Sequence, residues 1–182
     1  LLGIIALFIV ATPALNRIVE WNEAMHLPEA LYNIEQWMRQ QENAATKITE
    51  QILQVNSFSH FLAVIFGIGI LTGIGEEMIF RGVLQRIVQD KNHRAHVAVW
   101  ICAFLFSAIH LQFYGFIPRL LLGAFFGYLL VWSKNLWLPI FDHLFNNSTV
   151  ACISYFTNDK SPDNLIETVG TSGSPTSWLA GA

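Results

Sequence analysis

The feature that most limits what this chain can fold into is the length of its stretches without Asp, Glu, Lys or Arg. Residues 56–75, 95–118 and 120–133 contain none of these four residue types. Residues 135–158 contain only Asp142. A helix needs about 20 mostly apolar residues to cross the hydrocarbon core of a bilayer. The sequence therefore predicts an all-α fold, a polytopic transmembrane helix bundle with one helix outside the membrane.

The overall composition agrees with this prediction and excludes other classes. Charged residues make up 13% of the 182 residues, whereas soluble domains usually carry about 25%. The net charge of −3 leaves no basic surface for phosphates, so nucleic acid is not an expected partner. We expect an integral, multi-pass protein of the cell's inner membrane, in contact with the lipid bilayer. Basic residues near 86–94 and at Lys134 place the loops that carry them in the cytoplasm.

The apolar stretches divide the chain into four parts. Residues 1–15 match the second half of a transmembrane helix that ends at Pro13, and residues 157–182 form a polar tail leading to a further helix. We therefore expect the natural chain to be longer at both ends. Residues 16–55 form a polar region, and residues 56–156 form the transmembrane core. The expected helices of this core span residues 57–88, 96–112, 118–133 and 136–156.

The polar region 16–55 has a helical pattern of its own. Apolar residues recur at a spacing of seven in two rows, which begin at Leu31 and Ile34. This spacing predicts an amphipathic helix that starts near Pro28 and lies outside the membrane. Its apolar stripe would pack on the rest of the protein or on the membrane surface. The alternative is a coiled coil that binds a partner protein.

Several polar residues lie where the hydrocarbon core is expected, and charged groups at that depth are costly and usually functional. At a rise of about 1.5 Å per residue, Glu76 and His110 both lie roughly 20 Å from the short loop that joins their helices. These two helices should be antiparallel neighbours, so the two side chains can meet. His143 and Asn147 enter from the same side, to a depth of about 10 to 17 Å. We expect the four side chains to converge in one buried cavity.

Residues spaced by four share a helix face. Glu77 and Arg81 have this spacing, so they can form a supporting ion pair on one helix. Glu76 lies about 100° further around the same helix and is left for other work. Phe106 and His110 also have this spacing, so the phenyl ring can wall the site beside the imidazole.

A Glu, two His and an Asn in an apolar cavity suit the hydrolysis of a peptide bond. Glu76 and His110 can share a water molecule and remove its proton as a general base. His143 and Asn147 can donate hydrogen bonds to the oxyanion that forms when water attacks a carbonyl. Asp142 can orient an imidazole or face the loop before its helix, and we expect it to face the loop, where solvent reaches it.

Two other functions remain open from the residues alone. Glu76, His110 and His143 are acceptable zinc ligands, so a zinc-dependent intramembrane protease is possible in principle. No two histidines, however, lie four apart on one helix. The other alternative is a non-enzymatic membrane protein, such as an immunity factor or a scaffold that binds a partner through its amphipathic helix.

Three short motifs carry a resemblance. Glu76-Glu77-Met-Ile-Phe-Arg81 matches EExxxR, Phe106-Ser-Ala-Ile-His110 matches FxxxH, and His143-Leu-Phe-Asn-Asn147 matches HxxxN. In this order, each on an apolar helix, they resemble the CAAX protease and bacteriocin-processing family of intramembrane proteases, also called the Abi family. The resemblance covers about residues 57–156.

The resemblance implies a metal-independent glutamic endopeptidase without a cofactor, whose substrate is a membrane-associated protein or peptide. It assigns water activation to Glu76 and His110, and the oxyanion site to His143 and Asn147. Glu77 with its arginine partner would support them. Eukaryotic members remove the last three residues of prenylated proteins, whereas many bacterial members are linked to peptide maturation, bacteriocin self-immunity or membrane regulation. No feature of this chain chooses among these substrates.

Overall fold

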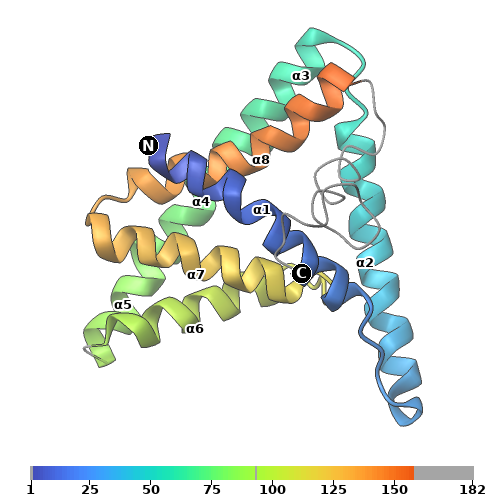
Figure 1. Ribbon diagram of the computed structural model, residues 1–182, viewed down its shortest axis with the longest axis horizontal. Coiled ribbons are helices and arrows are strands. Elements are labelled where there is room, and N and C mark those ends of the chain that lie inside the picture. Colours follow the sequence, from blue (N-terminus) through green and yellow to red (C-terminus); the bar gives the residue numbers. More distant parts are fainter. Residues whose placement is uncertain (1, 93, 158–182) are drawn as a thin grey trace.

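The described part of the chain is helical throughout. The structure is a computed structural model that describes residues 2–92 and 94–157, so the predicted polar tail beyond residue 157 lies outside the described residues. No strand occurs in these two ranges, which confirms the predicted all-α class. Besides one long helix, Figure 1 shows α1 (Leu2–Glu23), α2 (Tyr32–Leu53), α6 (Ala95–Ala108), α7 (Phe116–Ser133) and α8 (Trp137–Thr157), with the single turn η1 (Glu29–Leu31) before α2.

The long helix, which we call helix 58–92, contains two segments that depart from the α-helical hydrogen-bonding pattern. Two of its five segments are π-helical, so their N–H groups bond to the carbonyl five residues back instead of four. Thr72 adds a side-chain hydrogen bond of this spacing, because its Oγ1 donates to the Gly67 carbonyl at 3.1 Å. Such segments are frequent at functional sites. The five segments are α3 (Phe58–Val64), the π-helical η2 (Ile65–Leu71), α4 (Thr72–Glu77), the π-helical η3 (Met78–Leu84) and α5 (Gln85–Asn92).

Two helical stretches in the described part of the chain are long and apolar enough to cross a membrane. They are Phe58–Asp90, with 33 residues, and Phe116–Ser133, with 18 residues. Helix α6 is apolar but has only 14 residues. The number of times that the chain crosses the bilayer therefore stays a prediction.

Helix α6 ends earlier than the sequence predicts. It stops at Ala108 instead of residue 112, and His110 lies in the turn that follows. The His110 N–H donates to the Ser107 carbonyl at 3.3 Å, and Leu111 then adopts a left-handed φ of 54°. Because the chain reverses here, the His110 imidazole is presented from a turn rather than from a helix face.

Helix α1, in contrast, continues through Pro13 to Glu23, although the sequence predicts an end at this proline. An interior proline removes one backbone hydrogen bond and kinks a helix, but the helix can continue where packing compensates. The end of α1 is fixed by Asn22. Its Oδ1 accepts a hydrogen bond from the Ile117 N–H at 2.8 Å, and its Nδ2 donates to the Phe113 carbonyl at 3.1 Å. Helix α1 is thus attached to the start of α7.

Helices α6 and α7 run side by side (Figure 1) and approach closely at two glycines spaced by four. A Cβ atom at Gly123 would lie 3.3 Å from the Ala103 Cα. A Cβ atom at Gly127 would lie 3.0 Å from the Val99 side chain. Small residues at this spacing allow membrane helices to pack closely.

Helix α2 stands at one side of the bundle (Figure 1), and part of its apolar stripe is exposed. Leu31, Ile34 and Ile48 are 41%, 49% and 58% exposed. The face that contacts the described protein carries Glu42, which accepts a hydrogen bond from the Tyr114 N–H at 3.1 Å, and the buried Leu53. Met38, Ala45 and Val55 of the same two rows are half-buried, and Val55 packs on Leu53, Val64 and Ala151. The stripe therefore packs on the described protein only in part, and contact of the exposed part with the membrane surface or a partner stays a prediction.

One carboxylate of α2 holds the chain that precedes the helix. Glu35 accepts hydrogen bonds from the Arg39 guanidinium at 2.8 Å, the Leu27 N–H at 2.9 Å and His26 at 3.0 Å. The Arg39 hydrogen bond contributes most to lowering the pKa of Glu35 from 4.5 to about 2. The negative charge of Glu35 thus fastens the loop at residues 24–28 to α2.

Acid should release this attachment. Because the folded-state pKa of Glu35 is depressed, its contribution to stability is complete above pH 4.5 and is lost as the pH falls through about 2. We expect hydrogen exchange at residues 24–39 to accelerate over this interval in the wild type. In Glu35→Gln the exchange should be fast at every pH. Glu29→Gln, at an exposed carboxyl of η1, is the control, and identical profiles for all three proteins would contradict the prediction.

Helix 58–92 packs against α8 at a position where only glycine fits. A Cβ atom at Gly73 would lie 3.2 Å from the backbone nitrogen of Leu144 and 3.4 Å from its Cα, and these atoms cannot move without shifting α8. Overpacking of this kind costs about 1–3 kcal/mol. Gly73→Ala should therefore lower the thermal unfolding midpoint in detergent. Gly75→Ala is a matched control, because its Cβ would meet nothing within 4 Å, and a midpoint at or above that of the wild type is expected there.

Candidate active site

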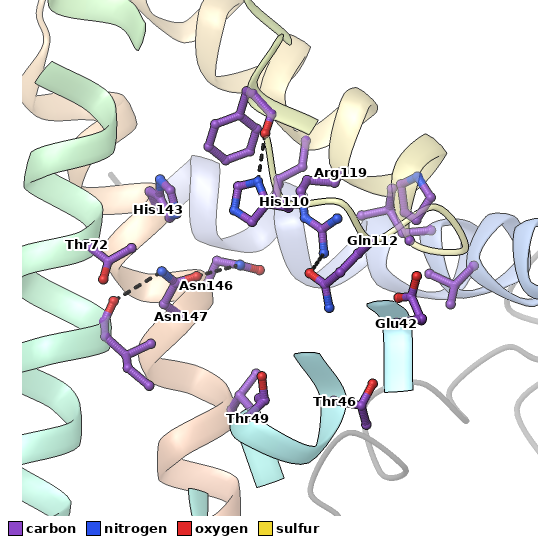
Figure 2. Close-up of a pocket in the computed structure, with 18 of the residues that line it drawn as sticks. Glu42, Thr46, Thr49, Thr72, His110, Gln112, Arg119, His143, Asn146 and Asn147 are labelled. Atoms are coloured by element: carbon purple, nitrogen blue, oxygen red, sulfur yellow. Dashed lines mark hydrogen bonds between the residues drawn. The ribbon is translucent and has the colours of Figure 1, made fainter. Parts of the chain in front are cut away.

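The four residues predicted to act in catalysis line one cavity of about 720 Å³. Glu76 comes from α4, His110 from the turn after α6, and His143 and Asn147 from α8. Figure 2 shows the two imidazoles and Asn147 on one wall, facing residues of α2 across the cavity. The structure thus brings the predicted residues together from three parts of the chain.

The predicted supporting pair lies behind this wall and is fully buried. The Arg81 Nη1 donates to the Glu77 Oε1 at 2.6 Å, and both side chains are 0% exposed. The Arg81 Nη2 donates to the Gly123 carbonyl of α7 at 2.7 Å. One turn further along, the Gln85 Nε2 donates to the Gly127 carbonyl at 3.1 Å. The predicted ion pair is confirmed, and it also joins helix 58–92 to α7.

His143 is held by this buried pair, a contact that the sequence did not predict. Its Nδ1 lies 2.9 Å from the Glu77 Oε1, the same oxygen that accepts the Arg81 hydrogen bond. Because a carboxylate only accepts, the hydrogen lies on the histidine Nδ1. The ring stacks on Phe126 with centroids 5.0 Å apart. The free ring nitrogen, Nε2, lies 3.7 Å from the Glu76 Oε2.

His110 is fixed in the same tautomer by a backbone carbonyl. Its Nδ1 lies 2.7 Å from the Phe106 carbonyl oxygen and therefore carries the hydrogen. The Nε2 of the neutral ring is then free to accept a proton. The Phe106 ring contacts both imidazoles edge-on, with centroids 5.2 Å from His110 and 5.9 Å from His143. The predicted contact between Phe106 and His110 is present.

The distances to Glu76 differ from the simplest expectation. Among the described residues, His143 and not His110 has a nitrogen within 4.0 Å of the Glu76 carboxylate. Glu76 and His110 nevertheless line the same cavity, and the Glu76 side chain is 25% exposed. A reacting molecule can therefore lie between them.

Asn147 faces the cavity but is partly engaged. Its Nδ2 donates to the Ile68 carbonyl in the π-helical η2 at 3.2 Å, and its Oδ1 accepts from the Asn146 Nδ2 at 3.2 Å. An amide nitrogen carries two hydrogens, so one remains for a second acceptor. Asn146 also lines the cavity (Figure 2), and the pair forms a short amide chain along α8.

Asp142 is buried, which corrects the expectation that it faces a solvent-exposed loop. Its side chain lies in the bundle, and the residue is 2% exposed. Neither carboxylate oxygen has a hydrogen-bond partner in the described part of the chain. The reason is that Asp142 lies on the side of α8 that meets the bundle, together with Ile140 and His143, which are also buried.

Two groups of cavity residues were missed from the sequence. One face of α2 contributes Glu42, Thr46 and Thr49 to the cavity wall (Figure 2), whereas only its apolar stripe was considered from the sequence. Arg119 of α7 also lines the cavity. It is the one charged residue in residues 95–133, and this isolation in an apolar stretch is the signal that could have identified it.

Metal ligation was tested against the same geometry. Within residues 2–92 and 94–157, no group of three or more His, Cys, Asp or Glu residues is arranged to hold a metal ion. Sensitivity of the activity to chelators would distinguish the zinc-dependent alternative from a metal-independent enzyme.

The described chain is an all-helical bundle with two membrane-length helices and a cavity lined by Glu, His and Asn side chains, and comparison with known proteins identifies its family. A family model described as type II CAAX prenyl endopeptidase Rce1-like matches residues 58–149, about half of the chain. The chain belongs to this family. It is thus a membrane protein of the CAAX-protease class.

One curated relative adds to this comparison. The uncharacterized protein YpbD of Bacillus subtilis (strain 168) is 28% identical over 109 residues, which cover 58% of this chain and 51% of the relative. The chain thus spans about half the length of the curated relative that it matches. No solved structure matches the chain.

Proposed function

We propose that the protein is a multi-pass intramembrane endopeptidase that hydrolyses a peptide bond of a membrane-associated protein or peptide. The observation that carries the proposal is the cavity in which Glu76, His110, His143 and Asn147 meet. Family membership supports proteolysis in general.

In the proposed reaction, a water molecule enters between Glu76 and His110. The Glu76 carboxylate, assisted by the His110 Nε2, takes a proton from the water, and the resulting hydroxide attacks the carbonyl carbon of the peptide. The carbonyl oxygen becomes an oxyanion and accepts hydrogen bonds from the free Asn147 N–H and from His143. The proton then passes to the leaving amine, and the products are a carboxylic acid and an amine.

The contacts of His143 define what this role requires. Its Nδ1–H is already donated to Glu77, so the ring can donate to an oxyanion only through a protonated Nε2. The imidazolium would then lie between the carboxylates of Glu76 and Glu77, whose negative charges stabilise it. The positive charge of Arg81 neutralises the negative charge of Glu77. This ion pair reduces the repulsion between the two carboxylates and the substrate oxyanion.

The proposal is tested by incubating the purified chain, in detergent micelles, with a library of internally quenched apolar peptides. Mass spectrometry of the products identifies the cleaved bond. We expect cleavage that persists in 1,10-phenanthroline and EDTA. Loss of activity in chelator with recovery on added Zn²⁺ would instead support the zinc-dependent alternative, and no cleavage with any peptide would favour the non-enzymatic immunity or scaffold role.

A further inference from the structure

The cavity contains one cation that the proposed reaction does not use. Arg119, in the first turn of α7, is the single Lys or Arg among the residues that line it. The acidic residues on the cavity wall outnumber it. They are Glu23, Glu42, Glu50 and Glu76. A lone cation among four carboxyl groups requires an explanation.

The contacts of Arg119 leave most of its hydrogen-bonding capacity unused. Its Nη2 donates to the Gln112 Oε1 at 2.6 Å, while its Nη1 is buried without an acceptor in the described part of the chain. No described carboxylate lies within 4.0 Å of the guanidinium, although acidic residues line the same cavity. Figure 2 shows this guanidinium beside the His110 imidazole, next to the proposed site of water activation.

Arg119 is half-buried, and its buried Nη1 without an acceptor is unfavourable because these N–H groups have lost their hydrogen bonds to water. An arginine in this state gains most from a carboxylate, which can accept two parallel N–H hydrogen bonds from the planar fork. Gln112 holds the guanidinium from the neighbouring turn, so less side-chain entropy is lost on binding. The surrounding glutamates would repel a carboxylate elsewhere in the cavity.

We infer that Arg119 binds a carboxylate of the peptide substrate and thereby fixes which peptide bond lies at the Glu76–His110 pair. This inference rests on the proposed function, and it adds a specificity-determining subsite to it. The carboxylate comes from the C-terminus of the peptide or from an acidic side chain near the cleaved bond. With either source, the cleaved bond would lie at a fixed distance from the carboxylate that Arg119 binds.

A purely structural role for Arg119 makes a different prediction. If Arg119 only fastens the turn at residues 109–115 through Gln112, its replacement lowers the stability of the protein and weakens the binding of all peptides equally. If it binds a carboxylate, its replacement removes a preference between peptides that differ only in that group. The preference, not the affinity itself, is therefore the quantity to measure.

The test uses fluorescein-labelled apolar decapeptides and the purified chain carrying Glu76→Gln, in which cleavage is slow. Fluorescence anisotropy in detergent micelles gives the Kd of three peptides. One ends in a free carboxylate, the second in an amide, and the third in an amide with Glu as its last residue. We expect the free carboxylate to bind about 10- to 100-fold more tightly than the plain amide, as charge-assisted hydrogen bonds usually provide.

Arg119→Gln should reduce this ratio to about one, and Arg119→Lys should retain part of it, because the lysine keeps the charge without the planar fork. Arg86→Gln removes an exposed cation of α5 outside the cavity lining and should keep the full ratio. Tight binding of the Glu-ended amide would identify a side-chain carboxylate as an accepted source, and weak binding would restrict the subsite to the C-terminus. Both results support the inference.

Equal Kd values for the carboxylate and the plain amide in the protein that retains Arg119 would overturn the inference, and so would the absence of binding by all three peptides. This comparison needs no Arg119 variant, so misfolding cannot obscure it. Cleavage by the wild type without any carboxylate preference would refute the subsite and leave the proposed function standing. A carboxylate preference without cleavage of any peptide would refute the protease and leave the subsite standing.

Discussion

Replacing Glu76 with Gln should slow peptide cleavage by about 10²- to 10⁴-fold, the usual contribution of general acid–base catalysis. The amide has nearly the shape of the carboxylate but cannot take a proton from water. The Glu76 side chain is 25% exposed to the cavity, and its contact with the His143 Nε2 is long, at 3.7 Å, so the fold should be retained. The measurement is kcat for the peptide identified in the library, with the thermal unfolding midpoint as evidence that the variant folds.

Asp90→Asn is the matched control, because it removes an exposed carboxyl from the same helix outside the cavity lining. Its kcat should equal that of the wild type. His110→Ala removes the other member of the proposed pair and should cause a loss of similar size. Full activity of Glu76→Gln would refute the proposed role of this residue, whereas a binding or immunity phenotype that survives in it would favour the non-enzymatic alternative.

Replacing Glu77 with Leu should destabilise the protein by about 3–5 kcal/mol, because it leaves the Arg81 charge buried without its partner. Arg81→Met should cost a comparable amount, because it leaves the buried Glu77 carboxylate without its arginine, with His143 as its remaining partner, and also removes the hydrogen bond to the Gly123 carbonyl. The double variant Glu77→Leu/Arg81→Met removes both charges and should recover much of the lost stability. Denaturant unfolding in micelles measures all three variants against the wild type.

Activity and stability should separate in this series. The double variant with Leu at 77 leaves the His143 Nδ1–H without its acceptor, so cleavage should stay low even where stability returns. Glu77→Gln/Arg81→Met keeps an acceptor oxygen for His143 and should be the more active of the two double variants. Single variants within about 1 kcal/mol of the wild type would show that the pair is not the electrostatic unit that its burial indicates.

The sequence predicted the parts of the site that depend on one helix at a time. The spacing of Glu77 and Arg81 was sufficient to predict their pairing. The number of residues from the connecting loop was sufficient to predict that Glu76 and His110 lie near the same cavity. The contact between Glu77 and His143 joins residues 66 positions apart. It depends on how α8 is rotated against helix 58–92, and no local pattern specifies that rotation.

Other misses have similar causes. Asp142 was expected to face solvent because it lies near a loop in sequence, but its exposure depends on which side of α8 meets the bundle. The early end of α6 results from the turn that precedes α7, where the Ser107 hydroxyl donates to the Phe116 carbonyl at 2.8 Å. Arg119 could have been found by the same reasoning that identified Glu76, since both are charged residues inside predicted membrane helices.

The π-helical segments of helix 58–92 change the interval at which its residues face the neighbouring helices. In a regular α-helix, four residues turn by about 40° more than a full circle, so positions repeated every four residues drift around the axis. The wider π turns offset this drift. Gly69, Gly73 and Glu77 contact Ser148, Leu144 and His143 of α8 in succession.

The same series continues without a break, because Arg81 and Gln85 then contact Gly123 and Gly127 of α7. Five positions at a constant interval of four thus form one seam along neighbouring helices. Between Gly69 and Gln85, the contacts of this helix with its neighbours therefore repeat every four residues rather than every 3.6. Inserting or deleting a single residue between Ile65 and Leu84 would rotate all later residues of the helix away from the contacts that they make with α7 and α8. Related sequences should therefore differ in this segment by substitution and not by length.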